Sequence, residues 1–88
     1  MFYTYVLRSK KDGELYIGST NNLSRRFKEH NTGQVQSTKS RYPLMLVYYE
    51  AYSAEDDARE REHQLKSRGQ ARHQLLKRVR RSLLQHFS

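Results

Sequence analysis

Two short runs rich in aromatic and β-branched residues open the chain, with a turn sequence between them. The runs are FYTYVLR, residues 2–8, and ELYIGST, residues 14–20, and Asp12-Gly13 lies in the segment that joins them. Aromatic and β-branched residues favour strands, and Asp-Gly is typical of the tight turn of a β-hairpin. The sequence therefore predicts an antiparallel hairpin, so the first 20 residues are expected to form two paired strands of a sheet.

The residues after the hairpin have the spacing of a short amphipathic helix. In NNLSRRFKEHNTG, either Asn21 or Asn22 can cap the helix, and Gly33 marks its end. One face of the predicted helix carries four residues at helical spacing, namely Leu23, Arg26, Phe27 and His30.

A polar segment and a third strand come next. Residues 34–41, QVQSTKSR, predict a mobile surface loop that either has no further role or contacts phosphate groups. After Pro43, the run LMLVYYEAY at residues 44–52 predicts a strand. This run is apolar enough for both of its faces to be largely covered.

A second helix is predicted over about residues 54–68. Ser53 followed by Asp56 resembles a capping box at its start. Glu62 falls on or beside the inward face of this helix, and burying a charge without a partner is costly, which makes Glu62 a candidate site residue. The apolar residues of the inward face are Ala54, Ala58 and Leu65.

The last predicted helix, at about residues 71–87, is basic and amphipathic. For its Lys/Arg face, a solvated surface and a contact with nucleic acid are both open. We expect its apolar stripe to pack on the sheet rather than on a membrane surface. The stripe is formed by Leu75, Leu76, Val79, Leu83 and Phe87.

Together these elements predict an α+β fold, a small three-stranded antiparallel sheet flanked by helices in the order β-β-α-β-α-α. The 88 residues include four Gly, one Pro and no low-complexity run, which predicts a single domain over residues 1–88. We expect its core motif at about 2–68 and its basic terminal helix at about 71–87.

Charge and residue usage narrow the class of function. Seventeen Lys and Arg against nine Asp and Glu give a net charge of +8, which favours binding to polyanions. Nine of the basic residues lie between Arg59 and Arg81, so the charge is segregated along the chain. The chain has no Cys, no apolar run long enough to span a bilayer and no signal-peptide pattern, which predicts a cytoplasmic protein that does not bind membranes.

A pair of tyrosine tripeptides lies in the two strands of the predicted hairpin. YTY at residues 3–5 and YIG at residues 16–18 put Tyr5 and Tyr16 eleven positions apart. This pattern resembles the signature of the GIY-YIG nuclease superfamily, although the first tripeptide keeps only its final tyrosine. The chain is similar to the small single-domain bacterial members over roughly residues 2–68, which implies their fold and a nuclease activity.

The resemblance extends to three positions beyond the tripeptides. Arg26, ten residues after Tyr16, corresponds to the catalytic arginine of the family, and His30, one helical turn later, to a position that holds His or Tyr. Glu62, in REHQLK, corresponds to the metal-binding glutamate. The resemblance thus implies five catalytic residues, with Glu62 also the metal ligand: Tyr5, Tyr16, Arg26, His30 and Glu62.

The implied reaction is hydrolysis of a phosphodiester bond in DNA with Mg²⁺ or Mn²⁺. A divalent cation held by Glu62, waters and phosphate oxygens stabilises the developing negative charge, and Arg26 offers a planar fork to phosphate oxygens. Tyr16 is predicted to orient or deprotonate the attacking water, with Tyr5 as a second candidate. His30 either shares this proton transfer or binds phosphate.

Further residues around the implied site are predicted to bind nucleic acid. Gly18 has no side chain, so we expect it to let the backbone and a ligand approach each other beside Tyr16. The predicted nucleic-acid-binding residues are Gly18, Asn22, Arg25, Arg26, Lys28, Lys39, Arg41 and Lys66.

Three classes of function stay open from the sequence. The first is a metal-dependent nuclease that acts on DNA in repair or recombination, with a protein partner as one source of substrate selectivity. The second is a DNA- or RNA-binding module with an idle site, whose binding falls steeply with salt and is unchanged by Glu62→Gln. The third is a protein-interaction domain that uses its basic helix. The presence of all the implied catalytic residues favours the nuclease.

Overall fold

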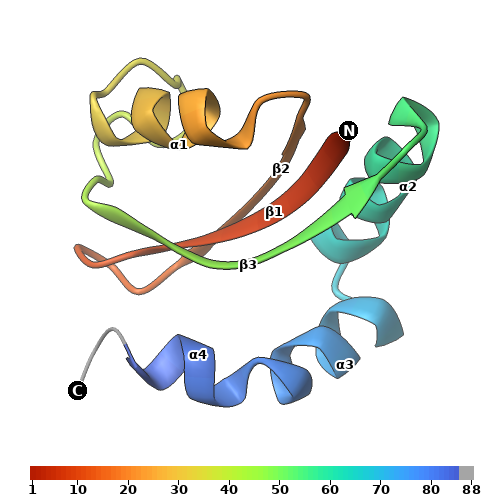
Figure 1. Ribbon diagram of the computed structural model, residues 1–88. Coiled ribbons are helices and arrows are strands. Elements are labelled where there is room, and N and C mark those ends of the chain that lie inside the picture. Colours follow the sequence, from red (N-terminus) through yellow and green to blue (C-terminus); the bar gives the residue numbers. More distant parts are fainter. Residues whose placement is uncertain (86–88) are drawn as a thin grey trace.

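The computed structural model describes residues 1–85, which form three strands and four helices (Figure 1). The predicted α+β fold is confirmed, and its elements follow one another in the predicted order up to the terminal helix. In chain order the elements are β1 (Phe2–Ser9), β2 (Leu15–Thr20), α1 (Leu23–Asn31), β3 (Leu44–Tyr52), α2 (Glu55–Lys66), α3 (Gln70–Arg78) and α4 (Arg80–Gln85).

The three strands form one antiparallel sheet in the order β2-β1-β3, so β1 is the central strand. On β1, Tyr5 lies directly opposite Gly18 of β2 and Tyr49 of β3. Because directly opposite residues point to the same face, this register decides which side chains meet. Helix α1 covers the face of Tyr5, and α2, α3 and α4 lie on the other side of the sheet (Figure 1).

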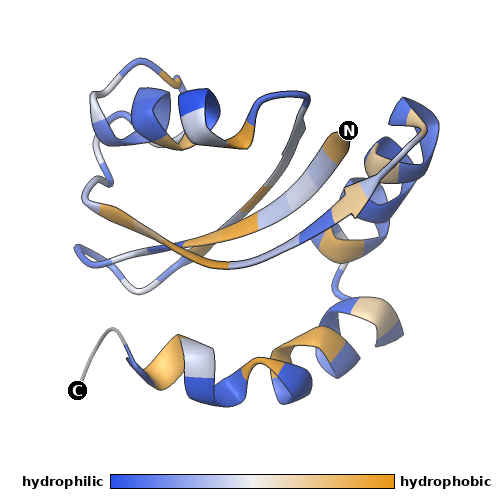
Figure 2. Ribbon diagram, viewed as in Figure 1, coloured by the Kyte–Doolittle hydropathy of each residue, from blue (hydrophilic) through white to orange (hydrophobic). Residues whose placement is uncertain are grey.

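The main apolar core lies between the sheet and the C-terminal helices. Val6 of the central strand and Val47 of β3 pack there against Leu65, Leu75 and Val79. Figure 2 shows apolar residues along the strands, whereas the residues of α1 and α2 are mostly hydrophilic. Successive side chains of β1 therefore point alternately into this apolar core and into the more polar space under α1.

The ends of α1 follow the predicted signals. Asn22 is the N-cap, and its side-chain oxygen accepts a hydrogen bond from the backbone N–H of Arg25. The helix stops at Asn31, and Gly33 follows with a φ of 75°, a left-handed conformation that favours glycine. The Asn31 side chain then exchanges two hydrogen bonds with the backbone of Leu44, which ties α1 to the start of β3.

One prediction about the middle of the chain was wrong. β3 is an edge strand, and Tyr49 is 52% exposed, so the two faces of this strand are not both covered. Residues 34–41 have neither helix nor strand, as expected of a loop, but Val35 and Thr38 are buried and two turn hydrogen bonds lie within the segment. The polar character of this segment therefore reflects buried hydrogen bonding as well as solvent exposure.

The helices of the second half also depart in detail from the prediction. The N-cap of α2 is Ala54, without a side-chain cap hydrogen bond, so the predicted capping box at Ser53 is absent. The predicted terminal helix is divided at Val79 into α3 and α4, and Phe87 of its apolar stripe lies outside the described residues. Within residues 1–85, no helix is long and apolar enough to cross a membrane.

Candidate active site

A buried hydrogen bond joins the first predicted catalytic tyrosine to the predicted histidine. The Tyr5 hydroxyl lies 2.9 Å from Nε2 of His30, and the two rings meet edge to face. Tyr5 is 3% and His30 4% exposed, and they come from the central strand and from α1. The other ring nitrogen of His30, Nδ1, lies 2.7 Å from the Thr38 hydroxyl. Sequence reasoning found the first two residues and missed Thr38, which has no local signal in its segment.

Arg26 completes this group from the preceding turn of α1. Its guanidinium lies near enough to the Tyr5 hydroxyl to act against the rise in the pKa of Tyr5. It also pairs with Glu29, with 3.1 Å between Nη1 and Oε1. Glu29 lies three residues after Arg26, and this spacing is visible in the sequence, but sequence reasoning did not select it. The structure thus brings Tyr5, Arg26 and His30 together as predicted.

The environment sets the protonation of both ring systems. Burial raises the pKa of Tyr5, and the neighbouring Arg26 offsets only part of this rise. Burial lowers the pKa of His30 from 6.5 to about 4, and the positive charge of Arg26 lowers it further. At neutral pH Tyr5 therefore keeps its proton, and His30 is a neutral imidazole with one protonated nitrogen.

Position 18 must be glycine because the Tyr5 side chain lies directly against its backbone. A Cβ atom added to Gly18 would lie 2.4 Å from the Tyr5 hydroxyl oxygen and 2.6 Å from Cζ. The ring of Tyr5 thus crosses directly over this glycine, its partner in the strand register. The expectation that Gly18 keeps space for a ligand beside Tyr16 was wrong, because the Tyr5 side chain fills that space.

Tyr16 lies on the same face of the sheet as Tyr5, but its hydroxyl does not join the Tyr5 group. Its hydroxyl donates a 3.4 Å hydrogen bond to Oδ2 of Asp12, and the same carboxylate oxygen lies 3.3 Å from Nε of Arg41. Burial raises the pKa of Tyr16, and the negative charge of Asp12 raises it further. The two tyrosines therefore have different partners, although Tyr16 and His30 line the same cleft.

Glu62 projects from α2 and is bound at both carboxylate oxygens. Ser19 donates to Oε1 at 2.7 Å, and Nζ of Lys66 lies 2.8 Å from Oε2. Burial raises the pKa of Glu62, but the hydrogen bonds from Lys66 and Ser19 outweigh it and hold the pKa below its usual range. The charge of Glu62 also acts on the Tyr5 hydroxyl, so it belongs to the same electrostatic environment.

The chemistry of these residues fits a weakly held divalent cation. Glu62 is 21% exposed in its side chain, and each of its oxygens keeps a lone pair beyond the bonds to Ser19 and Lys66. Across residues 1–85 there is no group of three or more His, Asp or Glu side chains able to hold a metal ion. One carboxylate with waters and phosphate oxygens is an arrangement that Mg²⁺ accepts. The residues therefore fit a cation that binds together with substrate.

A cleft of about 300 Å³ opens beside the Tyr5 group. It is lined by His30 and Ser37, by residues 14–17 at the start of β2, and by the junction between α2 and α3. This junction contributes three cations, Lys66, Arg68 and Arg72, of which only Lys66 was predicted. The run of basic residues after Glu62 was the available signal for the other two. His30 and Tyr16 thus line the same cleft as three cations.

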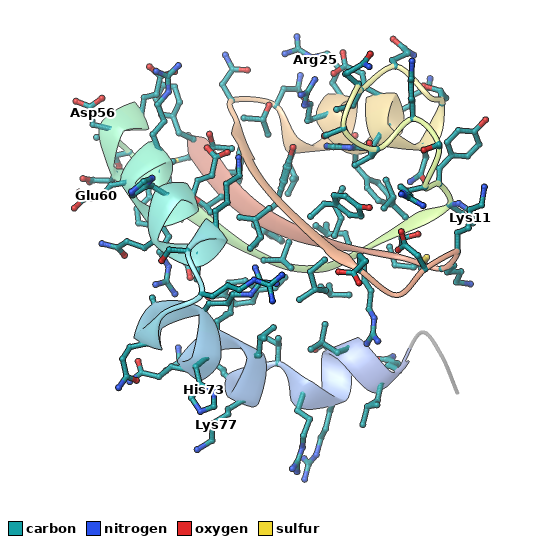
Figure 3. The ribbon with its side chains drawn as sticks, turned by 180° about the vertical axis from the view of Figure 1, so that it is seen from behind. Lys11, Arg25, Asp56, Glu60, His73 and Lys77 are labelled. Atoms are coloured by element: carbon teal, nitrogen blue, oxygen red, sulfur yellow. The ribbon has the colours of Figure 1, made fainter. Side chains whose placement is uncertain are left out.

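The other predicted nucleic-acid contacts are dispersed. The Asn22 side chain is engaged as the cap of α1, and Arg41 is paired with Asp12. Arg25 lies on the outer face of α1 and points away from the sheet (Figure 3). Lys28 and Lys39 are exposed to solvent. None of these four cations lines the cleft beside His30.

A family comparison identifies this arrangement. The GIY-YIG catalytic domain matches residues 1–76. The chain belongs to the GIY-YIG family. The family match reaches beyond the 2–68 predicted from the sequence and includes most of α3, which contributes Arg72 to the cleft.

Relatives of this GIY-YIG protein are small proteins of similar length. A UPF0213 protein of Pediococcus pentosaceus is 46% identical over 68 residues, which cover 76% of this chain and 70% of the relative. One from Natronomonas pharaonis is 40% identical over 75 residues, covering 84% and 87%. The solution NMR structure of a UPF0213 protein from Bacillus halodurans is 31% identical, with a TM-score of 0.54, over 90% of this chain and 85% of that chain. These comparisons confirm the predicted family and fold.

Proposed function

We propose that this GIY-YIG protein is a divalent-metal-dependent endonuclease that hydrolyses phosphodiester bonds in DNA. Its membership of a catalytic-domain family of nuclease type supports hydrolysis. The observation that carries the proposal is the hydrogen bond between the Tyr5 hydroxyl and His30, because His30 in turn lines a cleft that also contains three cations. A nuclease needs a group that moves the proton of water beside cations that hold phosphate, and this cleft offers both.

Tyr5 and His30 handle the proton of the attacking water. The water gives a proton to the Tyr5 oxygen as the Tyr5 hydrogen passes to Nε2 of His30, so the proton count is unchanged and hydroxide attacks phosphorus. The P–O bond to the leaving oxygen then breaks, that oxygen takes up a proton from solvent, and His30 gives its extra proton back to solvent. A bound phosphodiester raises the pKa of His30 by its negative charge, which improves His30 as an acceptor. In this assignment Tyr5 replaces Tyr16 as the first candidate.

Arg26 binds phosphate oxygens through its planar guanidinium. Its present partner is the partly exposed carboxylate of Glu29, so a phosphate must compete with a side chain that also keeps the guanidinium oriented. Lys66, Arg68 and Arg72 offer the neighbouring contacts to the DNA backbone.

Glu62 is the residue that would hold Mg²⁺ or Mn²⁺. When bound, such a cation polarises the phosphodiester and stabilises the charge on the leaving oxygen. The Lys66 ammonium now pairs with Oε2 of Glu62, so the remaining lone pairs of the carboxylate are the ones that would be offered to the cation. Ser19 holds the carboxylate from β2 and fixes its direction.

The test is cleavage of labelled single-stranded, duplex and branched DNA, and of RNA, in Mg²⁺ or Mn²⁺. Glu62→Gln removes the proposed metal ligand, and Glu60→Gln makes the same chemical change at an exposed position of the same helix (Figure 3). We expect cleavage by the native protein and by Glu60→Gln, and its loss in Glu62→Gln. Equal activity of all three proteins would overturn the proposed role of Glu62.

One observation favours a second candidate, a nucleic-acid-binding module with an idle site. Both oxygens of Glu62 are already bound within the chain, which is the arrangement expected of a purely structural ion pair. This candidate predicts DNA binding that falls steeply with salt, no cleavage by any of the three proteins, and the same affinity for Glu62→Gln as for the native protein.

The finer assignments rest on the sequence. A single domain over residues 1–88, a cytoplasmic location, a role in DNA repair or recombination and a protein partner that supplies selectivity stay predictions. The choice among DNA substrates in the cleavage experiment bears directly on the repair role, because branched and single-stranded DNA are intermediates of repair and recombination.

A further inference from the structure

Three polar groups from three separate segments form a buried row beside the cleft. Thr38 of the 34–41 segment contacts Nδ1 of His30, and Nε2 of His30 contacts the hydroxyl of Tyr5. Thr38 is 0% exposed, and the row ends at Tyr5 under α1. A buried threonine hydroxyl aimed at a catalytic histidine needs an explanation, because polar groups in such a place are retained only with matched partners.

The segment that carries Thr38 is fixed in place by its own contacts. The backbone N–H of Thr38 donates to the carbonyl of Val35 at 3.1 Å, and its carbonyl accepts from Arg41 at 2.9 Å. Val35 is itself buried. The hydroxyl of Thr38 is therefore held against His30 by turn hydrogen bonds and by apolar packing.

The direction of each hydrogen bond follows from the acidity of the two hydroxyl groups. The phenol of Tyr5 is a far stronger acid, and so a better donor, than the aliphatic hydroxyl of Thr38. The favoured arrangement therefore has the Tyr5 hydroxyl donating to Nε2 of His30, 2.9 Å away, which leaves Nε2 as the unprotonated nitrogen. In a neutral imidazole the hydrogen is then on Nδ1, where it meets the Thr38 oxygen at 2.7 Å.

We propose that Thr38 is a positioning residue that accepts the Nδ1–H hydrogen of His30 and so keeps Nε2 free to accept the Tyr5 proton. The inference rests on the proposed nuclease function, in which Tyr5 passes its proton to His30. Without an acceptor at Nδ1, the imidazole can turn or change tautomer and present an N–H to Tyr5. Tyr5 then has no group to which its proton can go. Thr38 thereby does for His30 what a buried orienting group does in other histidine-dependent hydrolases.

The proposal is tested by the ¹⁵N NMR signals of the His30 ring, which distinguish protonated from unprotonated nitrogen without any need for cleavage. Thr38→Val keeps the shape and removes the hydroxyl, and Thr38→Ser restores it. Thr4→Val is the matched control, because Thr4 is also buried and donates to a backbone carbonyl, that of Ala58, on the other face of the sheet.

In the native protein we expect Nδ1 to be protonated and Nε2 unprotonated. Thr38→Val should move the two signals toward each other or exchange them, whereas Thr38→Ser and Thr4→Val should keep the native pattern. A native His30 protonated at Nε2, or an unchanged pattern in Thr38→Val, would overturn the proposal. The native spectrum decides the point even where Thr38→Val does not fold.

Cleavage adds a separate readout. Thr38→Val should lower the single-turnover rate at least about tenfold with little change in DNA affinity, as expected for the loss of a group that acts on proton transfer. The expected NMR pattern in a protein that cleaves nothing would contradict the proposed function and leave the tautomer assignment standing. Cleavage at the native rate by Thr38→Val would contradict the role of Thr38 itself.

Discussion

Replacing Gly18 by Ala puts a methyl group where the Tyr5 side chain lies. The added Cβ would be 2.4 Å from the hydroxyl oxygen, 2.6 Å from Cζ and 2.9 Å from Cε2 of Tyr5, all shorter than carbon atoms tolerate. The φ angle of Gly18 is not in the left-handed region, so the clash arises from the Tyr5 ring and not from the backbone. Tyr5 cannot move freely, because it is buried and its hydroxyl is bound to His30.

We expect Gly18→Ala to lower the free energy of unfolding by about 1–3 kcal/mol, the usual cost of forcing extra atoms into a packed site. Tyr5→Leu removes the clashing atoms but keeps apolar bulk. In that background Gly18→Ala should be neutral or stabilise by up to about 1 kcal/mol, because alanine has less backbone freedom to lose than glycine. Urea unfolding of the four proteins of this double-mutant cycle gives the coupling between the two positions.

The refuting result is additivity. If Gly18→Ala has the same effect with Tyr5 and with Leu at position 5, the ring does not lie over Gly18. The register of the two strands at the candidate site would then be wrong.

Three further predictions concern pH, an ion pair and DNA binding. The pKa of His30 is lowered from 6.5 to about 4, so as pH falls this histidine takes up a proton in the unfolded chain before it does so in the folded one. The free energy of unfolding should therefore decrease between pH 6.5 and pH 4. The NMR signals of His30 should not titrate above about pH 5. Glu50 accepts two hydrogen bonds from Nε and one from Nη2 of Arg61, and these bonds outweigh burial and hold the pKa of Glu50 below 4.5. Glu50→Gln should therefore lower the free energy of unfolding by about 1–3 kcal/mol near pH 7, as measured by thermal unfolding. This loss should become smaller as pH falls below 4.5. Arg68→Ala, in the cleft, should weaken DNA binding and reduce by about one the slope of the logarithm of the binding constant against the logarithm of the salt concentration. An equal effect of Lys77→Ala on α3 would assign DNA binding to the terminal helices instead.

Local signals in the sequence were sufficient for most of the elements. The hairpin, the cap at Asn22 and the stop at Gly33 depend on residues within a few positions of one another, and the structure confirms them. The start of α2 was misread because Ser53 and Asp56 have the spacing of a capping box, whereas the helix begins after Ala54. Its acidic first turn complements the helix dipole without a side-chain cap.

The position of β3 at the sheet edge was not readable from its composition. An apolar run predicts burial on both faces, but aromatic residues can also cover a half-exposed surface. Tyr49 does this by meeting the ring of Tyr3 edge to face at a centroid distance of 6.0 Å. Strand order depends on contacts between distant segments, which no local pattern encodes.

The candidate site was predicted as a set of residues but not as a geometry. The spacing of Arg26 and His30 on one helical face is a local property, so their meeting with Tyr5 could be expected once the family pattern was seen. The strand register puts Tyr16 on the same face as Tyr5, and the Tyr16 hydroxyl bonds to Asp12 in the turn, which the spacing in the sequence did not reveal. Thr38 is placed by the path of a whole segment, for which the sequence offers no periodicity.

The most direct test of the account compares Tyr5→Phe with Tyr16→Phe in single-turnover cleavage of DNA. Each change removes one hydroxyl and keeps the ring, so the packing of both strands is preserved. The account predicts that Tyr5→Phe slows cleavage at least about 100-fold, because it removes the group that passes a proton to His30, and that Tyr16→Phe slows it much less. Full activity of Tyr5→Phe together with loss of activity in Tyr16→Phe, or no cleavage by the native protein on any substrate, would contradict it.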